Sequence, residues 1–160
     1  MGGHAGLSVH VRSPEQPAVE PTVVIASAHP LLALGVRGRL EGHGFRVVGE
    51  ALTAPELVTA VRCHRPDICL VDAALPGGAL AAAREARAHS RLAVVFLMSA
   101  DDSDDGALAI EAVRAGAAGV LFENMDPGRL VYALRDVAAG GSAVPRMLVA
   151  RLLDELQLSA

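Results

Sequence analysis

Four polar side chains stand at the ends of short apolar runs, where buried strands would finish. Asp72 closes one run, and Ser27, Ser99 and Glu123 follow three others. If the runs are parallel strands, their ends share one edge of a sheet, the edge at which folds of this kind bind ligands. Carboxylate and hydroxyl oxygens at such an edge are groups that bind cations. The sequence therefore predicts a candidate site there.

The predicted edge lacks the pairs of groups that enzymatic catalysis requires. No side chain near Asp72 or Ser27 supplies a nucleophile together with its activator. The sequence has no Ser-His-Asp order, and Gly77 and Gly78 do not make a phosphate loop or a dinucleotide fingerprint. His29 precedes a proline, so we interpret it as a helix start rather than a catalytic base. We therefore expect that the chain is not an enzyme.

An acidic segment follows the fourth apolar run and adds an alternative. Residues 101–105 read Asp-Asp-Ser-Asp-Asp. One interpretation makes Asp101 and Asp102 a substitute cation site, because clustered carboxylates bind divalent cations. The other, which we favour, is a solvated loop that caps the next helix through Ser103 or Asp104.

The composition fits a small core between helices and a sheet. The chain has 160 residues, enough for one domain, of which 52% are hydrophobic and only 2% aromatic. A core of Ala, Val, Leu and Ile suits helices packed on a parallel sheet. The formal charge of −4 lacks the basic excess of a nucleic-acid surface, so any contact with DNA belongs to a domain outside this chain.

Two further features concern the cellular compartment. Cys63 and Cys69 form no CxxC pair, so we expect two free thiols in a reducing cytosol. No stretch is long and apolar enough to cross a membrane, and the N-terminus lacks the cations and the apolar run of a signal peptide. We therefore expect a cytoplasmic protein that makes no contact with a membrane.

Apolar runs and helical patterns alternate along the chain in five repeats. The runs cover 23–26, 45–48, 67–72, 92–98 and 118–122. The helical patterns start at Pro30, at a capping box of Thr53 and Glu56, at about 79, after the acidic segment, and at Asp126-Pro127. Parallel strands need long crossovers that are usually helical. The five repeats therefore predict an α/β fold with helices on both faces of a parallel sheet.

Two further segments flank the predicted domain, which covers residues 22–140. Residues 1–21 are rich in Gly and Pro and have no hydrophobic period, so we interpret them as a disordered leader. Residues 141–160 carry a helix from about Pro145 to Leu156 with its leucines on one face. That helix either folds back on the domain or serves as a linker or dimer helix, and the sequence leaves both alternatives open.

Several fragments of the chain, in order, resemble one protein family. They are Ala26-Ser27-Ala28-His29-Pro30-Leu31, Val48-Gly49-Glu50-Ala51, 66–72, Leu75-Pro76-Gly77 and 114–121. Together they resemble response-regulator receiver domains, most of all those of LuxR-type (NarL/FixJ-like) transcription regulators. The resemblance implies a (βα)5 doubly wound, flavodoxin-like (CheY-like) sheet of five parallel strands in the order 2-1-3-4-5, here with an extra C-terminal helix.

The resemblance also implies a chemistry at the predicted edge. In the family, an aspartate that ends the third strand accepts a phosphoryl group, and two acidic residues after the first strand help to hold magnesium. A hydroxyl residue ends the fourth strand, and a lysine ends the fifth. Asp72 matches the phosphoacceptor, and Ser99 matches the hydroxyl residue, with Met98 as a second register.

Four positions depart from the family's pattern. Ser27 and Ala28 stand in place of the acidic pair, Val120 in place of a switching aromatic residue, and Glu123 in place of the lysine. Magnesium is usually held by carboxylates, and Ala28 offers no oxygen ligand. Glu123 would repel a phosphoryl group. We therefore expect that the chain has no cofactor, that magnesium binds weakly or not at all, and that Asp72 is not phosphorylated by the usual route.

Three hypotheses of function follow. The first is an atypical receiver that controls transcription as a homodimer, with a helix-turn-helix DNA-binding domain beyond Ala160. Its dimer would form through helices four and five or through the final helix. The second is a pseudo-receiver that binds a small ligand at an apolar rim of Ser27, Ala28, Met98 and Val120. The third is a stand-alone adaptor that binds another regulatory protein.

Overall fold

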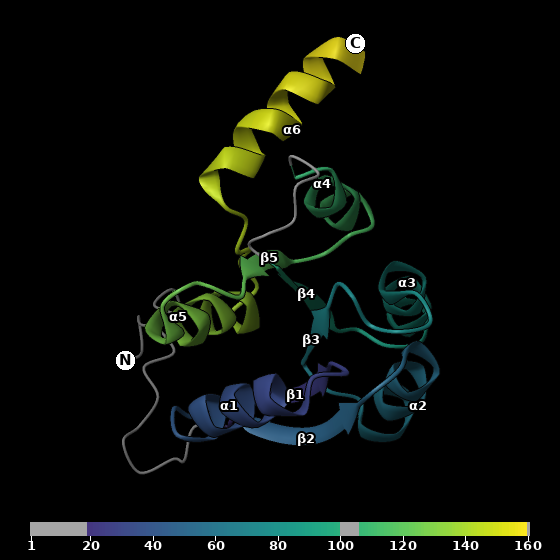
Figure 1. Ribbon diagram of the computed structural model, residues 1–160, viewed down its shortest axis with the longest axis vertical. Coiled ribbons are helices and arrows are strands. Elements are labelled where there is room, and N and C mark those ends of the chain that lie inside the picture. Colours follow the sequence, from purple (N-terminus) through teal and green to yellow (C-terminus); the bar gives the residue numbers. More distant parts are fainter. Residues whose placement is uncertain (1–18, 100–105, 160) are drawn as a thin grey trace, which may run out of the picture.

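The computed structural model describes residues 19–99 and 106–159, in which strands and helices alternate (Figure 1). The strands are β1 (Thr22–Ala26), β2 (Arg46–Ala51), β3 (Ile68–Asp72), β4 (Ala93–Met98) and β5 (Gly119–Phe122). The helices are α1 (Pro30–Glu41), α2 (Ala54–His64), α3 (Ala79–His89), α4 (Ala107–Arg114), α5 (Pro127–Ala138) and α6 (Arg146–Ser159).

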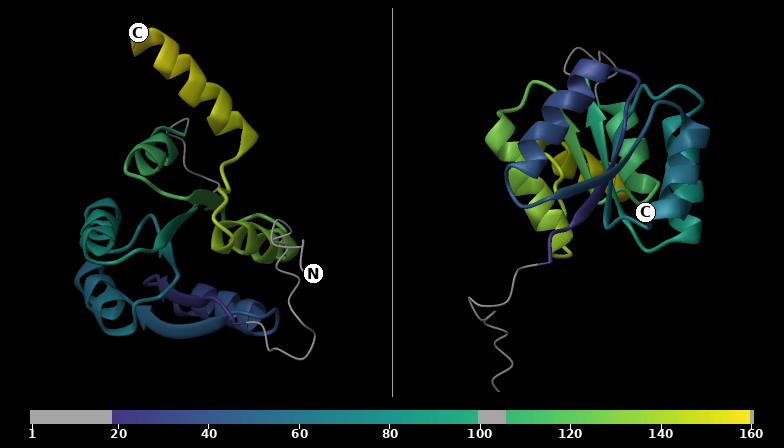
Figure 2. Two further views of the ribbon diagram at one scale, coloured as in Figure 1. Left: turned by 180° about the vertical axis from the view of Figure 1, so that it is seen from behind. Right: turned by 90° about the horizontal axis from the view of Figure 1, so that it is seen from below.

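The five strands form one parallel sheet in the order β2-β1-β3-β4-β5. Helices α1 and α5 cover one face, and α2, α3 and α4 cover the other, as Figure 1 and Figure 2 show from three directions. The predicted doubly wound fold and its strand order are thereby confirmed. Because all strands run the same way, the ends of β1, β3, β4 and β5 meet at one edge.

The central strand β3 divides its side chains between two cores. Cys69 and Val71 pack toward α2, α3 and α4, whereas Ile68 and Leu70 pack toward α1 and α5. Successive strand residues point to opposite faces, so Asp72 follows Leu70 onto the side of α1 and α5. This register places Asp72 on the side of Ser27 and His29, which lie between β1 and α1.

Two helix starts follow from the local sequence. Pro30 occupies the first turn of α1, directly after His29, where its missing N–H is not needed. At the start of α2, Thr53 Oγ1 accepts a hydrogen bond from the N–H of Glu56 at 3.3 Å. The Glu56 carboxylate accepts in turn from the N–H of Leu52 at 2.6 Å. The predicted capping box is confirmed, with the glutamate reaching one residue further back than Thr53.

The second strand is longer than the apolar run at 45–48 predicts. Its last residues pair with β1 after a register shift between Val23 and Val24. An edge strand can carry polar residues because one of its sides faces solvent. Glu50 uses that freedom and forms an ion pair with Arg37 of α1 at 3.0 Å. The apolar run alone could not reveal this polar continuation of the strand.

Residues 142–159 attach to the outer edge of β5 and to α4. Ala143 forms a parallel bridge with Gly119, and its carbonyl accepts from the N–H of Val120 at 2.9 Å. A Cβ at position 119 would lie 3.0 Å from that carbonyl, so the glycine permits the close approach. Helix α6 then buries Leu148 in the core beside α4 and extends away from the domain (Figure 1). The helix therefore contacts the domain along one side, near its start, and its role stays open.

Two predicted segments lie outside the described residues. They are most of the leader, at 1–18, and the acidic segment, which includes Asp101 and Asp102. The disordered leader and the cation loop stay predictions, as does the domain boundary at 140. Over the described ranges, no helix combines the length and the apolar character needed to cross a membrane.

Candidate functional site

The carboxylate of Asp72 lies at the end of β3, and only 5% of the residue is exposed. Its Oδ1 accepts a hydrogen bond from the N–H of Ala74 at 2.9 Å, and its Oδ2 accepts one from Ser27 Oγ at 3.1 Å. A carboxylate withdrawn from water needs such partners, because burial without them is costly. Each oxygen of Asp72 therefore has a protein donor.

Ser27 follows β1 at a position where the resemblance calls for an acidic residue, and it is 3% exposed. Its N–H donates to the carbonyl of Ala51 at 2.9 Å. Its hydroxyl accepts from the N–H of His29 at 3.1 Å while it donates to Asp72. A hydroxyl can do both because it is a donor and an acceptor at once. Ser27 therefore joins the ends of β1, β2 and β3 to the start of α1.

The imidazole of His29 lies beside the same carboxylate but faces solvent. Its Nε2 is 3.8 Å from Asp72 Oδ2, and 65% of the side chain is exposed. The contact becomes an ion pair only when the ring is protonated. The backbone of His29 forms the N-cap of α1, in agreement with the predicted helix-start role.

Two of the departing positions contribute no positive charge to Asp72. Ala28 is exposed and carries no oxygen on its side chain. Glu123 is exposed after β5, where its N–H donates to the carbonyl of Met98 at 2.9 Å. Within the described ranges, no hydrogen bond or ion pair joins its side chain to Asp72. The sequence contains no lysine, so no other lysine can take the place of the one that the family has at the position of Glu123.

The end of β4 resolves the two registers of the predicted hydroxyl residue. Met98 is buried in the core on the side of α2, α3 and α4. Ser99 is the first residue after the strand and is exposed. Leu97 pairs with Asp72 in the sheet, and Ser99, two residues further on, falls on the same face. The structure therefore places Ser99, not Met98, at the candidate edge.

Val120 lies in the middle of β5 and is fully buried. It belongs to the core cluster that also contains Leu148 of α6 and several residues of α4. A switching aromatic residue would need to move between core and surface. The side chain of Val120 is not at the surface, and residues of α4 and α6 share its cluster.

The described side chains at this edge do not supply the ligand set of a magnesium site. Magnesium requires a near-octahedral set of oxygen ligands, usually with carboxylates. Ser27 already uses its hydroxyl to bind Asp72, and Ala28 supplies nothing. In the described part of the chain, no three His, Cys, Asp or Glu side chains are grouped to hold a metal ion.

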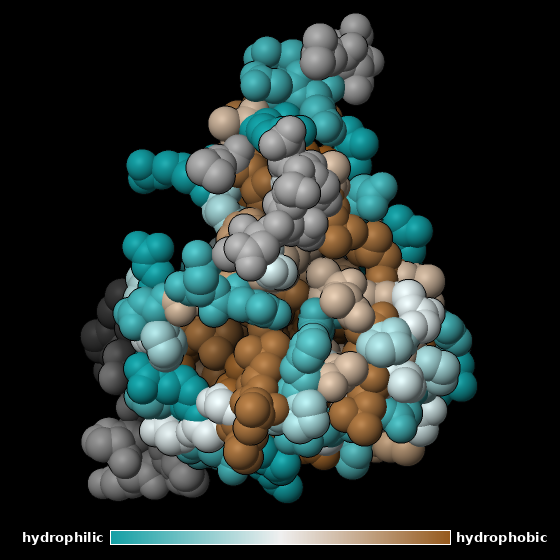
Figure 3. Space-filling view, in the orientation of Figure 1, coloured by the Kyte–Doolittle hydropathy of each residue, from teal (hydrophilic) through white to brown (hydrophobic). Residues whose placement is uncertain are grey.

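An apolar cleft of about 380 Å³ lies next to this edge, between α1 and α5. Leu32, Phe122 and Met125 are among its apolar walls, and Arg39 and Glu123 are its charged residues. Hydrophobic surface also gathers over α1 in the lower half of Figure 3. The cleft was not predicted from the sequence, although the apolar residues Leu31 and Leu32 at the start of α1 are among those that line it.

Two of the four residues of the predicted ligand rim are buried, and ligand binding there stays a prediction. Met98 and Val120 are buried in the core and do not line the apolar cleft. Both belong to runs in which every residue is apolar. Such a run does not reveal which residue faces the edge and which faces the core.

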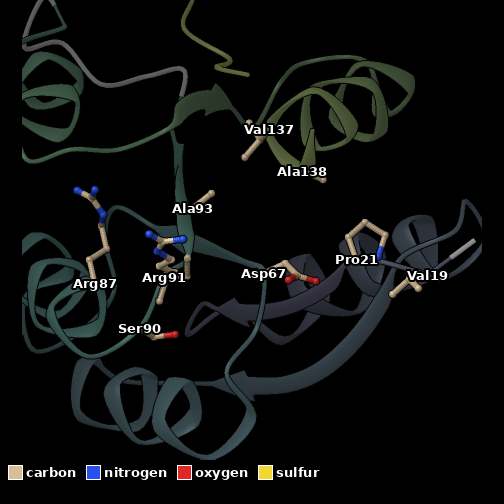
Figure 4. Close-up of a pocket in the computed structure, with 10 residues that line it drawn as sticks. Val19, Pro21, Asp67, Arg87, Ser90, Arg91, Ala93, Val137 and Ala138 are labelled. Atoms are coloured by element: carbon tan, nitrogen blue, oxygen red, sulfur yellow. The ribbon is translucent and has the colours of Figure 1, made fainter. Parts of the chain in front are cut away.

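A larger hollow of about 670 Å³ lies at the opposite edge, where the strands begin. Figure 4 shows Arg87 and Arg91 on one side of it and Asp67 near Pro21 on the other. Asp67 is already bound by Thr22, whose N–H donates to Oδ2 at 2.8 Å. None of the predicted site residues lies there, so the candidate site remains the Asp72 edge.

Comparison with known sequences agrees with the resemblance to receiver domains. Residues 23–135 match the family model of the response regulator receiver domain. The "Probable transcriptional regulatory protein NarL" of Mycobacterium tuberculosis is 35% identical over 141 residues, which cover 86% of this chain and 64% of that protein. The nitrate/nitrite response regulator protein NarL of Escherichia coli K12 is 30% identical over 150 residues, covering 91% and 66%.

Comparison with solved structures agrees. A two-component response regulator of the LuxR family from Aurantimonas sp. SI85-9A1 superposes with a TM-score of 0.75 at 29% identity, over 85% of this chain and 97% of that one. The present chain spans only about two thirds of the length of the two curated relatives. The family model and the shared fold both include the Asp72 edge, and the chain therefore belongs to the response regulator receiver domain family.

Proposed function

We propose that this chain is the receiver domain of a transcription regulator whose output does not require phosphorylation of Asp72. A DNA-binding domain outside this chain would contact DNA, and the receiver would control it through protein contacts that include self-association. The relative from M. tuberculosis is named a transcriptional regulatory protein, which supports the proposal. The proposed protein works in the cytoplasm and is not an enzyme.

The hydrogen bond from Ser27 to Asp72 carries the proposal. It satisfies a buried acceptor oxygen at 3.1 Å with a neutral group. A cation about 4 Å from one carboxylate gains on the order of 4 kcal/mol at an effective dielectric of about 20, and positions 27 and 28 supply neither carboxylate. The pocket is therefore built to keep Asp72 satisfied without magnesium, rather than to gather the charges that phosphoryl transfer needs.

Intact mass after incubation with acetyl phosphate, with and without magnesium, tests this proposal. We expect no gain in mass for the natural sequence. A variant with Ser27→Asp, Ala28→Asp and Glu123→Lys restores the charges that the family uses. It should gain one phosphoryl group only when magnesium is present, and Asp72→Ala in that background should abolish the gain.

The matched control replaces the same residues without restoring charge. Ser27→Asn, Ala28→Asn and Glu123→Gln should remain unmodified, because amides do not replace the missing carboxylates or the lysine. A magnesium-dependent gain by the natural sequence that is lost in Asp72→Ala would overturn the proposal. The domain would then be a working phosphoswitch, and its cation site would use ligands other than those at positions 27 and 28.

The apolar cleft between α1 and α5 favours a second candidate function, the binding of a small apolar ligand. A pocket of a few hundred Å³ with apolar walls and a few polar groups is typical of ligand sites. Here the polar groups are Arg39 and Glu123. Gly35 lies on the wall, and a Cβ added there would meet nothing within 4 Å.

A thermal-shift screen of small apolar carboxylic acids and amines tests this second function. A binding compound should raise the melting temperature, and Gly35→Leu should remove the shift by filling the cleft. Gly38→Leu is the matched control, because it lies on the same helix, also meets nothing within 4 Å and does not line the cleft. If both variants keep the shift, the compound binds elsewhere.

A further inference from the structure

Two cationic side chains line the hollow of about 670 Å³ at the edge where the strands begin. Arg87 lies in the last turn of α3, and Arg91 lies in the segment that joins α3 to β4. Figure 4 shows both side chains on the same side of the hollow. Two guanidinium groups on one wall attract anions, because their positive potentials add.

The charges of the two arginines are not neutralised by the described part of the chain. Of the described residues that line the hollow, Asp67 alone carries a carboxylate. Its Oδ2 accepts hydrogen bonds from the N–H of Thr22 at 2.8 Å and from Thr22 Oγ1 at 3.1 Å. Within the described ranges, no carboxylate forms an ion pair with Arg87 or Arg91. The lining therefore keeps one positive charge in excess.

The guanidinium of Arg87 is held against the end of α4. Its Nη1 donates a hydrogen bond to the carbonyl of Ala115 at 3.2 Å. Gly116 follows with a φ of +95°, and a Cβ added there would overlap Nη1. The glycine therefore leaves the space that the guanidinium occupies. A guanidinium has five N–H donors, so a group fixed by one of them can still bind an anion with others.

Hydrophobic side chains form other walls of the same hollow. Val137 and Ala138 project from the end of α5, and Leu92 precedes β4. Ser90 adds a hydroxyl, which can donate to an oxygen of a ligand. A concave site with apolar walls and a few polar groups is typical of small-molecule binding. The lining therefore suits a ligand that is anionic at one end and apolar at the other.

The helix dipole explains only part of this arrangement. A cation in the last turn of a helix stabilises its carbonyl end, and Arg87 meets that description. Arg91 lies outside the helix, because Ser90 before it is the C-cap and has an extended backbone. The dipole therefore accounts for one arginine and not for the pair.

We propose that the hollow binds a small organic anion, with its carboxylate or phosphate group on Arg87 and Arg91 and its apolar part against Val137. Guanidinium groups bind both kinds of oxyanion, and their planar fork matches two oxygens at once. The inference goes beyond the proposed function, because the hollow lies at the edge of the sheet opposite Asp72. A ligand there would give the domain an input that leaves the Asp72 edge free.

NMR titration of the isotope-labelled chain with phenylacetate and with phenyl phosphate tests the site. Either probe should shift the amide signals of Leu92 and Ala138 in a saturable way and leave that of Ala74, beside Asp72, in place. Binding of only one probe identifies the anionic group and supports the inference. Neutral phenylacetamide and inorganic phosphate each lack one half of the ligand, so each should bind at least about tenfold more weakly.

Variants with matched controls locate the bound anion. Arg91→Gln should raise the Kd of the tighter probe by about tenfold, because an amide replaces a charged donor. Arg84→Gln should leave the Kd unchanged, since Arg84 is exposed on α3 and does not line the hollow. Ala138→Phe should also raise the Kd by filling the hollow, whereas Ala139→Phe, one residue outside the lining, should not. Circular dichroism verifies that each variant is folded.

Three results would overturn the inference. They are probes that leave the Leu92 and Ala138 signals in place, an amide probe that binds as tightly as the anions, and a Kd that Arg91→Gln or Ala138→Phe does not change. Gly35→Leu separates this site from the cleft between α1 and α5 and should leave the Kd unchanged. A loss of binding in Gly35→Leu would place the anion in that cleft, beside Arg39, and would also overturn the inference.

Discussion

Two aspartates stand at the two ends of β3, and each accepts a hydrogen bond from a hydroxyl near β1. Thr22 Oγ1 lies 3.1 Å from Asp67 Oδ2, and Ser27 Oγ lies 3.1 Å from Asp72 Oδ2. Asp67 is exposed at the edge where the strands begin, beside the hollow of Figure 4. Asp72 is buried at the edge where they end. A hydroxyl–carboxylate hydrogen bond of the same length therefore occurs once in an exposed place and once in a buried place.

The two environments determine how much each hydroxyl contributes to the stability of the fold. At Asp67, water can replace a lost partner, so the net value of the hydrogen bond is small. At Asp72, water has little access, and a lost partner leaves a buried oxygen unsatisfied. In a receiver that binds magnesium, the buried oxygens have a cation nearby. Here Ser27, which departs from the family's pattern, donates a hydrogen bond to one of these oxygens.

Removing the buried hydroxyl should have the largest effect on stability. Ser27→Ala leaves Asp72 Oδ2 without its donor and the N–H of His29 without its acceptor. We expect the free energy of unfolding to fall by about 2 kcal/mol. Urea denaturation at pH 7 measures it, and the m-value shows whether the folded state stays compact.

Asp72→Asn in the Ser27→Ala background separates the causes. If the loss comes from an unsatisfied buried charge, the amide should recover much of it, because a neutral group is less costly to bury. A Ser27→Ala variant as stable as the natural sequence would mean that water reaches Asp72 after all, and the contrast between the two ends of β3 would collapse.

The sequence predicts the strands well and the hydrogen bonds poorly. The run at 67–72 identifies β3 because all of its strand residues are buried, and the strand order then brings Ser27 and Asp72 to one edge. Their contact depends on how β1 is aligned with β3, with Ala26 opposite Val71, and no local pattern encodes that alignment. That Ser27 and Asp72 lie at one edge was therefore predictable, and the hydrogen bond between them was not.

The C-terminal segment shows a second limit of prediction. The leucine spacing predicts α6, because a helical period is a local property. The bridge between Ala143 and Gly119 joins positions far apart in the sequence, and a single paired residue leaves no periodic trace. That bridge helps to decide which face of α6 meets the domain, so the sequence left the two roles of the helix open.

The titration of a buried thiol in β3 measures how far water reaches the strand between its two ends. Cys69 is buried, and burial raises the pKa of its thiol from 9.0 to about 12. The unfolded chain then loses this proton at a lower pH than the folded chain, so stability is complete below pH 9 and falls as the pH rises from 9 toward 12. Between pH 9 and pH 10 we expect a loss of about 1 kcal/mol from this group.

Urea denaturation at the two pH values, compared for three sequences, measures this loss. Cys69→Ala should flatten the dependence on pH, whereas Cys63→Ala should not, because Cys63 is exposed. The absence of lysine removes the usual competing titration in this range. If Cys69→Ala keeps the full slope, the middle of β3 is open to water and the thiol is not its source.

Removing the exposed hydroxyl at the other end of the strand should have the smallest effect. Thr22→Val deletes the bond from Oγ1 to Asp67 and the bond that Oγ1 accepts from the N–H of Asp67 at 3.0 Å. It keeps the bond from the N–H of Thr22 to Asp67 Oδ2 at 2.8 Å, together with a branched side chain that suits a strand. Water can solvate Asp67 in the variant, so we expect a loss below about 1 kcal/mol. The quantity that matters is the difference from Ser27→Ala, measured under the same conditions. Equal losses at the two ends would mean that each hydroxyl acts by aligning β1 with β3, and that burial gives Asp72 no special dependence on Ser27.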